Sequence, residues 1–204
     1  MRSVRHLAIA VVAGALYALL GNAVSHAPPR GIDLAGRAFA GEAPRLALIF
    51  TESCLWPVLV TFAIAAILIA IRYPAWRARV IFALPTTLIT WQVSDALKNV
   101  FRRPRPSYWS LVHEPSFAYA SGHAMFAVLV YWLWAWFVWK SDLPRPARIV
   151  VSALLALWGC GVIWSRLALG AHFVTDLLGG MLLAATALAL ASAIGDVLEA
   201  RALK

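Results

Sequence analysis

Six long apolar stretches, separated by shorter polar connections, dominate the hydrophobic pattern of this 204-residue chain. Each has roughly the ~20 mainly apolar residues that a helix needs to cross a bilayer. Lipid cannot hydrogen-bond free backbone groups, so such stretches cross as helices. The predicted spans are residues 7–24, 46–71, 80–97, 122–139, 149–164 and 177–195. The pattern therefore predicts an all-α, polytopic six-transmembrane-helix bundle that forms one domain over residues 1–204.

Individual residues within the spans refine this picture. Pro57 is expected to kink the long second span. Gly179 and Gly180 allow close helix contact in the sixth. The second half of the fourth span contains four tryptophans: Trp132, Trp134, Trp136 and Trp139. We expect these to be lipid-facing and interfacial anchors rather than a stacking platform.

The start of the chain has two interpretations. Arg2 and Arg5 before an apolar stretch are typical of a cleavable signal peptide, and Ser25-His26-Ala27 resembles a cleavage site. However, Pro28 and Pro29 follow at once, and the stretch is long enough to span the membrane. We therefore expect a retained first span.

The composition supports a membrane protein and argues against a nucleic-acid partner. The chain is 62% hydrophobic and 13% charged, whereas a soluble domain has about 25% charged residues. Its net charge of +9 comes from short basic clusters between apolar stretches, as in helical membrane proteins. Cys54 and Cys160 both lie in apolar stretches, so we expect neither a disulfide framework nor a metal site.

The clearest candidate chemistry lies between the fifth and sixth spans, in residues 165–176. On a helix, His172 and Asp176 would lie on one face, one turn apart. Asp176 could then bind one imidazole nitrogen and leave the other free as a nucleophile or base. Arg166 is a planar cation that suits a phosphate. The alternative is an interfacial helix end with unrelated polar groups.

A second polar stretch follows the third span. It contains four cations, Lys98, Arg102, Arg103 and Arg105, and two prolines that indicate a shaped segment. Asp95 lies three residues before Lys98 and can pair with it. The alternative is a basic cluster that holds anionic lipid head groups beside the membrane.

A third stretch, Ser121-Gly122-His123, precedes the fourth span. Serine caps helix starts, and free N–H groups there attract anions. Glycine allows an anion to approach the backbone closely. Taken alone, this stretch is better explained as a helix cap with an incidental histidine. If the helices alternate in direction, however, all three stretches lie on one membrane face.

Together the three stretches resemble a known signature. It consists of Lys98, six residues and Arg105-Pro106; then Ser121-Gly122-His123; then Ser165-Arg166, five residues, His172, three residues and Asp176. This pattern is similar to that of the type 2 phosphatidic acid phosphatase superfamily, in its membrane branch of lipid phosphate phosphatases. Ala120 departs from the family, which usually has proline there. We expect a small effect on loop order and no loss of activity.

The resemblance implies a lipid phosphatase that works through a phosphohistidine. His172 would attack phosphorus, Asp176 would orient it, and His123 would protonate the leaving oxygen and then activate water. The implied phosphate ligands are Lys98, Arg105, Ser121, Gly122 and Arg166. Arg102 and Arg103 have no motif role, and we assign them to auxiliary binding of head groups or a second phosphate. We expect no cofactor and no metal, because no carboxylate cluster suits Mg²⁺.

The substrate and the reaction class remain open at this stage. Undecaprenyl or another polyprenyl diphosphate is the first choice of substrate. Phosphatidylglycerophosphate, phosphatidic acid and lipid A phosphate are the others. One alternative is a lipid-to-lipid phosphotransferase, and another is a catalytically silent membrane protein that binds anionic lipids. We expect no obligate protein partner.

Charge asymmetry predicts the orientation. Six spans place both termini and the connections 72–79 and 140–148 on one face, with ten cations against three elsewhere outside the motifs. Excess Lys and Arg marks the cytoplasmic side. We therefore expect cytoplasmic termini in a bacterial inner membrane and an active site that faces the periplasm or the outside.

Overall fold

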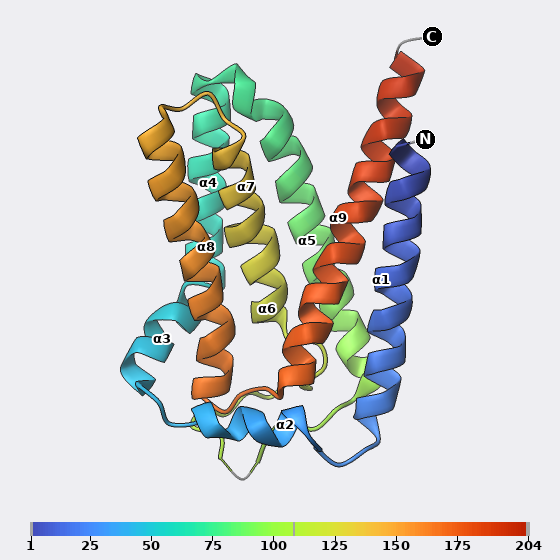
Figure 1. Ribbon diagram of the computed structural model, residues 1–204, viewed down its shortest axis with the longest axis vertical. Coiled ribbons are helices and arrows are strands. Elements are labelled where there is room, and N and C mark those ends of the chain that lie inside the picture. The colour runs from blue at the N-terminus through green and yellow to red at the C-terminus, as the bar shows by residue number, and fades with distance from the viewer. Residues whose placement is uncertain (1, 108, 203–204) are drawn as a thin grey trace.

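Long helices form an upright bundle, and the short helix α2 lies across one end of it (Figure 1). The computed structural model describes residues 2–107 and 109–202, and all regular structure in these ranges is helical. The elements are α1 (Arg2–Ser25), α2 (Ile32–Ala35), η1 (Gly36–Phe39), α3 (Pro44–Glu52), α4 (Trp56–Arg72), η2 (Pro74–Trp76), α5 (Arg77–Phe101), α6 (Gly122–Phe126), η3 (Ala127–Trp132), α7 (Leu133–Trp139), α8 (Arg145–Ala168) and α9 (Val174–Ala202). Lys204, one of the ten cations counted above, lies outside the described residues.

The predicted bundle of membrane-spanning helices is confirmed, with one correction in the second span. Within the described ranges, five helices are long and apolar enough to cross a membrane, or six if α3 and α4 form one span. These two helices meet at 49°, so residues 46–71 are not a single kinked helix.

The break lies at residues 53–55, just before the expected kink at Pro57. Pro57 is instead in the first turn of α4, where its missing N–H leaves no bond unmade. Ser53 satisfies groups that the break frees. Its hydroxyl donates to the Phe50 carbonyl at 2.6 Å, and its own carbonyl accepts from the Tyr131 hydroxyl at 3.0 Å.

The fourth span, α6–η3–α7, lies inside the bundle and contains a π-helical segment, η3. Trp136 and Trp139 are exposed, as anchors in lipid would be, whereas the prediction is wrong for Trp134, which is buried and packs against Phe62. Trp132 is half-buried and donates to the Ala156 carbonyl at 3.1 Å. Residues two apart on a helix point to nearly opposite sides, so these tryptophans could not all face lipid.

Helix α9 contacts the beginning of α6 closely at Gly180. A Cβ there would collide with the Ser121 carbonyl and lie 3.1 Å from the Met125 amide nitrogen. A Cβ at Gly179 would collide with the ring of Tyr119. The expected close contact is therefore confirmed, and it fixes α9 against the segment that carries Ser121 and His123.

Two substitutions in α9 test this contact. Gly180→Ala should lower the thermal unfolding midpoint in detergent, because overpacking against backbone typically costs about 1–3 kcal/mol. Gly195→Ala is the matched control, because its Cβ would meet nothing within 4 Å. It should leave the midpoint unchanged or raise it, as alanine favours helices. Tryptophan fluorescence would follow the unfolding. Equal midpoints for the two variants would contradict the packing argument.

Candidate active site

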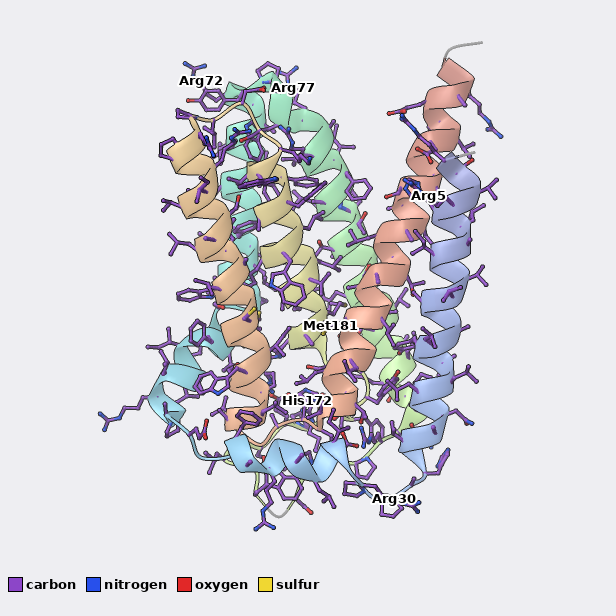
Figure 2. The ribbon with its side chains drawn as sticks, viewed as in Figure 1. Arg5, Arg30, Arg72, Arg77, His172 and Met181 are labelled. Atoms are coloured by element: carbon purple, nitrogen blue, oxygen red, sulfur yellow. The ribbon has the colours of Figure 1, made fainter. Side chains whose placement is uncertain are left out.

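The three motif stretches meet at the end of the bundle where α5 and α8 end and where α6 and α9 begin. Figure 2 shows His172 at this end, with Arg30 nearby, whereas Arg72 and Arg77 lie at the opposite end. The alternating directions of the helices produce this convergence, as the sequence pattern predicts.

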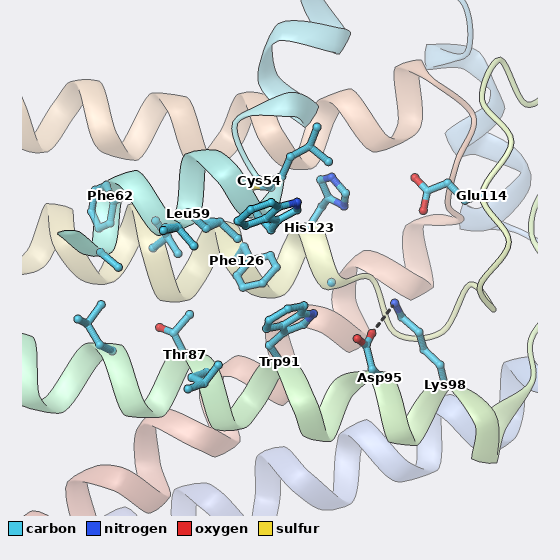
Figure 3. Close-up of a pocket in the computed structure, with 18 of the residues that line it drawn as sticks. Cys54, Leu59, Phe62, Thr87, Trp91, Asp95, Lys98, Glu114, His123 and Phe126 are labelled. Atoms are coloured by element: carbon cyan, nitrogen blue, oxygen red, sulfur yellow. Dashed lines mark hydrogen bonds and ion pairs between the residues drawn. The ribbon is translucent and has the colours of Figure 1, made fainter. Parts of the chain in front are cut away.

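An elongated cavity of about 490 Å³ begins at these residues and runs between α4 and α5. Figure 3 shows its polar end near Lys98, Glu114 and His123, and its apolar part between Leu59 and Trp91. The lining of the polar end is Asp95, Lys98, Arg105, Glu114, Gly122, His123 and His172. The cavity therefore joins a charged site to an apolar groove.

His172 lies in the turn before α9 rather than on a helix, so the predicted shared helical face with Asp176 is corrected. The chain bend still brings the two together, with 3.4 Å between His172 Nδ1 and Asp176 Oδ2. On the other side of the ring, Arg105 Nη1 lies 3.0 Å from Nε2. A guanidinium has only donors, so Nε2 presents its lone pair and the ring proton is on Nδ1, which lies near Asp176 but makes no hydrogen bond to it.

The surroundings of His172 favour its neutral ring. Burial lowers its pKa well below the usual value, and the charges of Arg105 and Arg166 lower it further. The neutral form of an imidazole is the one that acts as a nucleophile or base.

Glu114 lies between two cations that the sequence pattern assigns to phosphate. Its carboxylate pairs with Arg105 Nη2 at 2.9 Å and with the guanidinium of Arg166. Burial alone would raise the pKa of Glu114, but Arg166 and Arg105 outweigh it and hold the pKa below the usual value. The carboxylate thus occupies an anion site beside His172.

Sequence reasoning missed Glu114, although a signal existed. It is the only acidic residue between residues 96 and 141, a part of the chain that begins with the four cations of the second motif stretch. A lone carboxylate near several cations is a candidate to pair with them when no other anion is bound.

Arg166 is buried in the last turn of α8. Besides Glu114, its guanidinium donates to the hydroxyl of Thr51, which lies in α3 just before the break. The break in the second span therefore orients a residue of the fifth span. Thr51 had no detectable signal in the sequence, because the break itself was not predicted.

The residues of segment 121–123 have different contacts. Ser121 caps α6 as predicted, accepting from the Ala124 amide at 3.4 Å, and its amide donates to the Asp176 carbonyl at 3.0 Å. Gly122 and His123 line the cavity. His123 Nε2 is buried and has no hydrogen-bond partner among the described residues. It is therefore available to a ligand in the cavity.

The remaining cations have different environments. Lys98 lines the cavity and pairs with Asp95 at 3.2 Å, as predicted. Arg102 is exposed and follows the last residue of α5 with a positive φ of 49°. Its Nε donates to the Asn99 carbonyl at 3.0 Å, and its auxiliary role with head groups stays a prediction.

The auxiliary role predicted for Arg103 does not fit its environment. The residue is only 2% exposed, and its side chain pairs with Asp33 and Asp176 at 2.6 Å each. It also lies 4.4 Å from the centre of the Phe173 ring. Arg103 is therefore a buried structural partner of the His172–Asp176 pair, called the dyad below, rather than a head-group ligand. The pairing with Asp33 was not predicted, because nothing in the sequence indicates that the polar segment 25–45 contacts residue 103.

Comparison with known proteins agrees with this geometry. The profile of the PAP2 superfamily matches residues 76–197. Phosphatidylglycerophosphatase B of Bacillus subtilis (strain 168) is 40% identical over 93 residues, which are 43% of this chain and 44% of that protein. Phosphatidylglycerophosphatase B of Escherichia coli (strain K12) is 37% identical over 87 residues, 42% of this chain and 31% of that protein. The chain thus matches less than half the length of either curated relative.

A solved structure agrees over more of the chain. The crystal structure of a transmembrane PAP2-type phosphatidylglycerolphosphate phosphatase from Bacillus subtilis superposes with a TM-score of 0.72 and 25% sequence identity. The superposition covers 93% of this chain and 96% of that one. Because the family profile spans more than half of the chain and includes all three motifs, the chain belongs to the PAP2 superfamily.

Proposed function

We propose that this protein is a lipid phosphatase that hydrolyses a phosphate ester through a phosphohistidine. One observation carries the proposal: the imidazole of His172, with Nε2 beside Arg105, lies at the charged end of an apolar groove. Phosphoryl transfer depends mainly on positioning and on cations around the phosphoryl oxygens. Lys98, Arg105 and Arg166 supply such cations.

The reaction uses two steps. His172 Nε2 bonds to phosphorus while the bond from phosphorus to the lipid oxygen breaks, and His123 gives a proton to that oxygen. His123 then takes a proton from water, whose oxygen bonds to phosphorus as the nitrogen–phosphorus bond breaks. Asp176, facing Nδ1, stabilises the positive charge that the imidazole carries between the steps.

The groove suits the tails of a lipid. Apolar side chains from α4, α5 and α6 line it, including Leu59, Leu88 and Phe126. A lipid can lie there with its tails in the groove and its phosphate beside His172. Since Glu114 holds Arg105 and Arg166, the phosphoryl group must exchange with that carboxylate.

Phosphatidylglycerophosphate is the substrate that the relatives favour, since two of them are named phosphatidylglycerophosphatase B. Charge asymmetry led us to place polyprenyl diphosphate first, on the argument that an outward-facing site would recycle a carrier lipid. Both lipids present a terminal phosphoryl group, which leaves a glycerol oxygen in the first and an oxygen of a second phosphate in the other, so both belong in the assay.

The first test is phosphate release by purified protein offered phosphatidylglycerophosphate, undecaprenyl diphosphate, phosphatidic acid and lipid A in parallel. We expect release in excess EDTA and inhibition by vanadate, because cations of the chain itself replace a metal. His172→Ala should lower the rate by more than about 100-fold, since general acid–base effects alone reach ~10²–10⁴. Loss of activity in EDTA that Mg²⁺ restores would refute the metal-independent mechanism. Transfer of phosphate to a second lipid without release would indicate a phosphotransferase.

A second prediction concerns Glu114. Glu114→Gln removes the anion that competes for Arg105 and Arg166, so vanadate and inorganic phosphate should inhibit at several-fold lower concentrations. Glu42→Gln, a change of an exposed carboxylate outside the cavity, is the control. An unchanged or weaker inhibition constant in the Glu114→Gln variant would show that the carboxylate is not displaced by phosphate.

A third prediction concerns orientation. We place the active site on the periplasmic or outer side, with the Arg72 and Arg77 end in the cytoplasm (Figure 2). In a Cys54→Ala, Cys160→Ala background, Ser107→Cys should react with an impermeant reagent on spheroplasts, whereas Asp142→Cys should not. Both positions are exposed. The reverse pattern would place the site in the cytoplasm.

A further inference from the structure

The buried carboxylate of Asp33 lies outside every motif of the site. It belongs to α2, the short helix that crosses the end of the bundle (Figure 1), and only 4% of the residue is exposed. Burying a charge is costly unless it is paired and hydrogen-bonded. The contacts of Asp33 therefore indicate what it does.

Asp33 first holds the start of α9. It accepts from the Thr175 amide at 2.9 Å and from the Thr175 hydroxyl at 2.8 Å. The amide of Thr175 is one of the free donors in the first turn of α9, so a carboxylate from a distant helix caps that turn. Asp176 is the next residue, and the capped turn fixes its position.

Asp33 also shares a cation with Asp176. Arg103 Nη2 donates to Asp33 Oδ2, and Arg103 Nη1 donates to Asp176 Oδ1, both at 2.6 Å. With Arg103 as its sole partner, the charge of Asp176 would be neutralised. Two carboxylates on one guanidinium leave one net negative charge in this buried cluster, facing Nδ1 of His172.

We propose that Asp33 is a positioning residue for the dyad: it caps the turn that carries Asp176 and shares Arg103, so that Asp176 retains the charge that stabilises His172 when the ring becomes positive. This inference rests on the proposed phosphatase function for its kinetic consequence. The charges of Asp33, Arg103 and Asp176 also lead to a prediction about the pKa of the His172 ring, which does not depend on that function.

The kinetic test compares Asp33→Asn with the double variant Asp33→Asn/Arg103→Met. Asp33→Asn removes the excess negative charge, so kcat should fall about tenfold. Removal of a residue that hydrogen-bonds to a metal ligand lowers activity by a comparable factor. KM should stay within about twofold, because Asp33 does not line the cavity. The double variant restores one net negative charge and should recover most of kcat, whereas a merely structural role predicts a further loss. Glu42→Gln is the carboxylate control.

The second readout does not need turnover. Five histidines make ¹⁵N-histidine labelling practicable, and the His172→Gln spectrum assigns the signal. Asp33→Asn should lower the pKa of His172 further, since a lost negative charge disfavours the imidazolium, and the double variant should reverse this. The other groups facing the ring are the same in all variants: Lys98, Arg105, Glu114, His123, Arg166 and Asp176.

Each outcome decides the inference. A lowered pKa in Asp33→Asn that the double variant reverses supports it. Equal pKa values within about 0.2 unit, or a double variant that is slower than Asp33→Asn, overturns it. Absence of phosphate release by the unaltered protein would refute the proposed function instead, and the titration would still decide the role of Asp33.

Discussion

Repulsion between buried cations is the constraint on which the site depends. Lys98, Arg105 and Arg166 are the cations proposed to surround a phosphoryl group, and they lie at the end of an apolar bundle where charges are weakly screened. Carboxylates offset part of the repulsion: Asp95 pairs with Lys98, and Glu114 is shared by both arginines. These pairs lower the cost of holding the cations together when no phosphoryl group is bound.

The same pairing limits how tightly the site holds an anion. A phosphoryl group that enters gains contacts with Arg105 and Arg166 but breaks their pairs with Glu114. The net affinity is then a difference between two ion-pair arrangements rather than the full attraction of two guanidinium groups. This favours release of the phosphate product, which a buried and unbalanced pair of arginines would retain.

Periodicity and motif spacing predicted much of this structure, and tertiary contacts account for the rest. The spans follow from apolar length, and the site end follows from alternating direction. The break at residues 53–55 was not predictable, because two partners of Ser53, Tyr131 and Trp158, lie in other spans. Asp33 escaped for a related reason, because its partner Arg103 lies 70 residues away in the sequence. Glu114 differs, because its position as a lone acid after four cations was a signal that the motif pattern did not use. Trp134 was misassigned because the sequence does not distinguish a tryptophan that faces lipid from one that faces the core of the bundle.

The groove between α4 and α5 has a kinetic consequence. Its rim contains exposed apolar residues such as Trp56, Val60 and Leu88, so under the proposed function a lipid substrate would enter from the bilayer without leaving it. Encounter then occurs in two dimensions, and the rate depends on the mole fraction of substrate among the surrounding lipids rather than on its bulk concentration. Added detergent would dilute the surface around the groove and slow the reaction while leaving every contact at His172 intact.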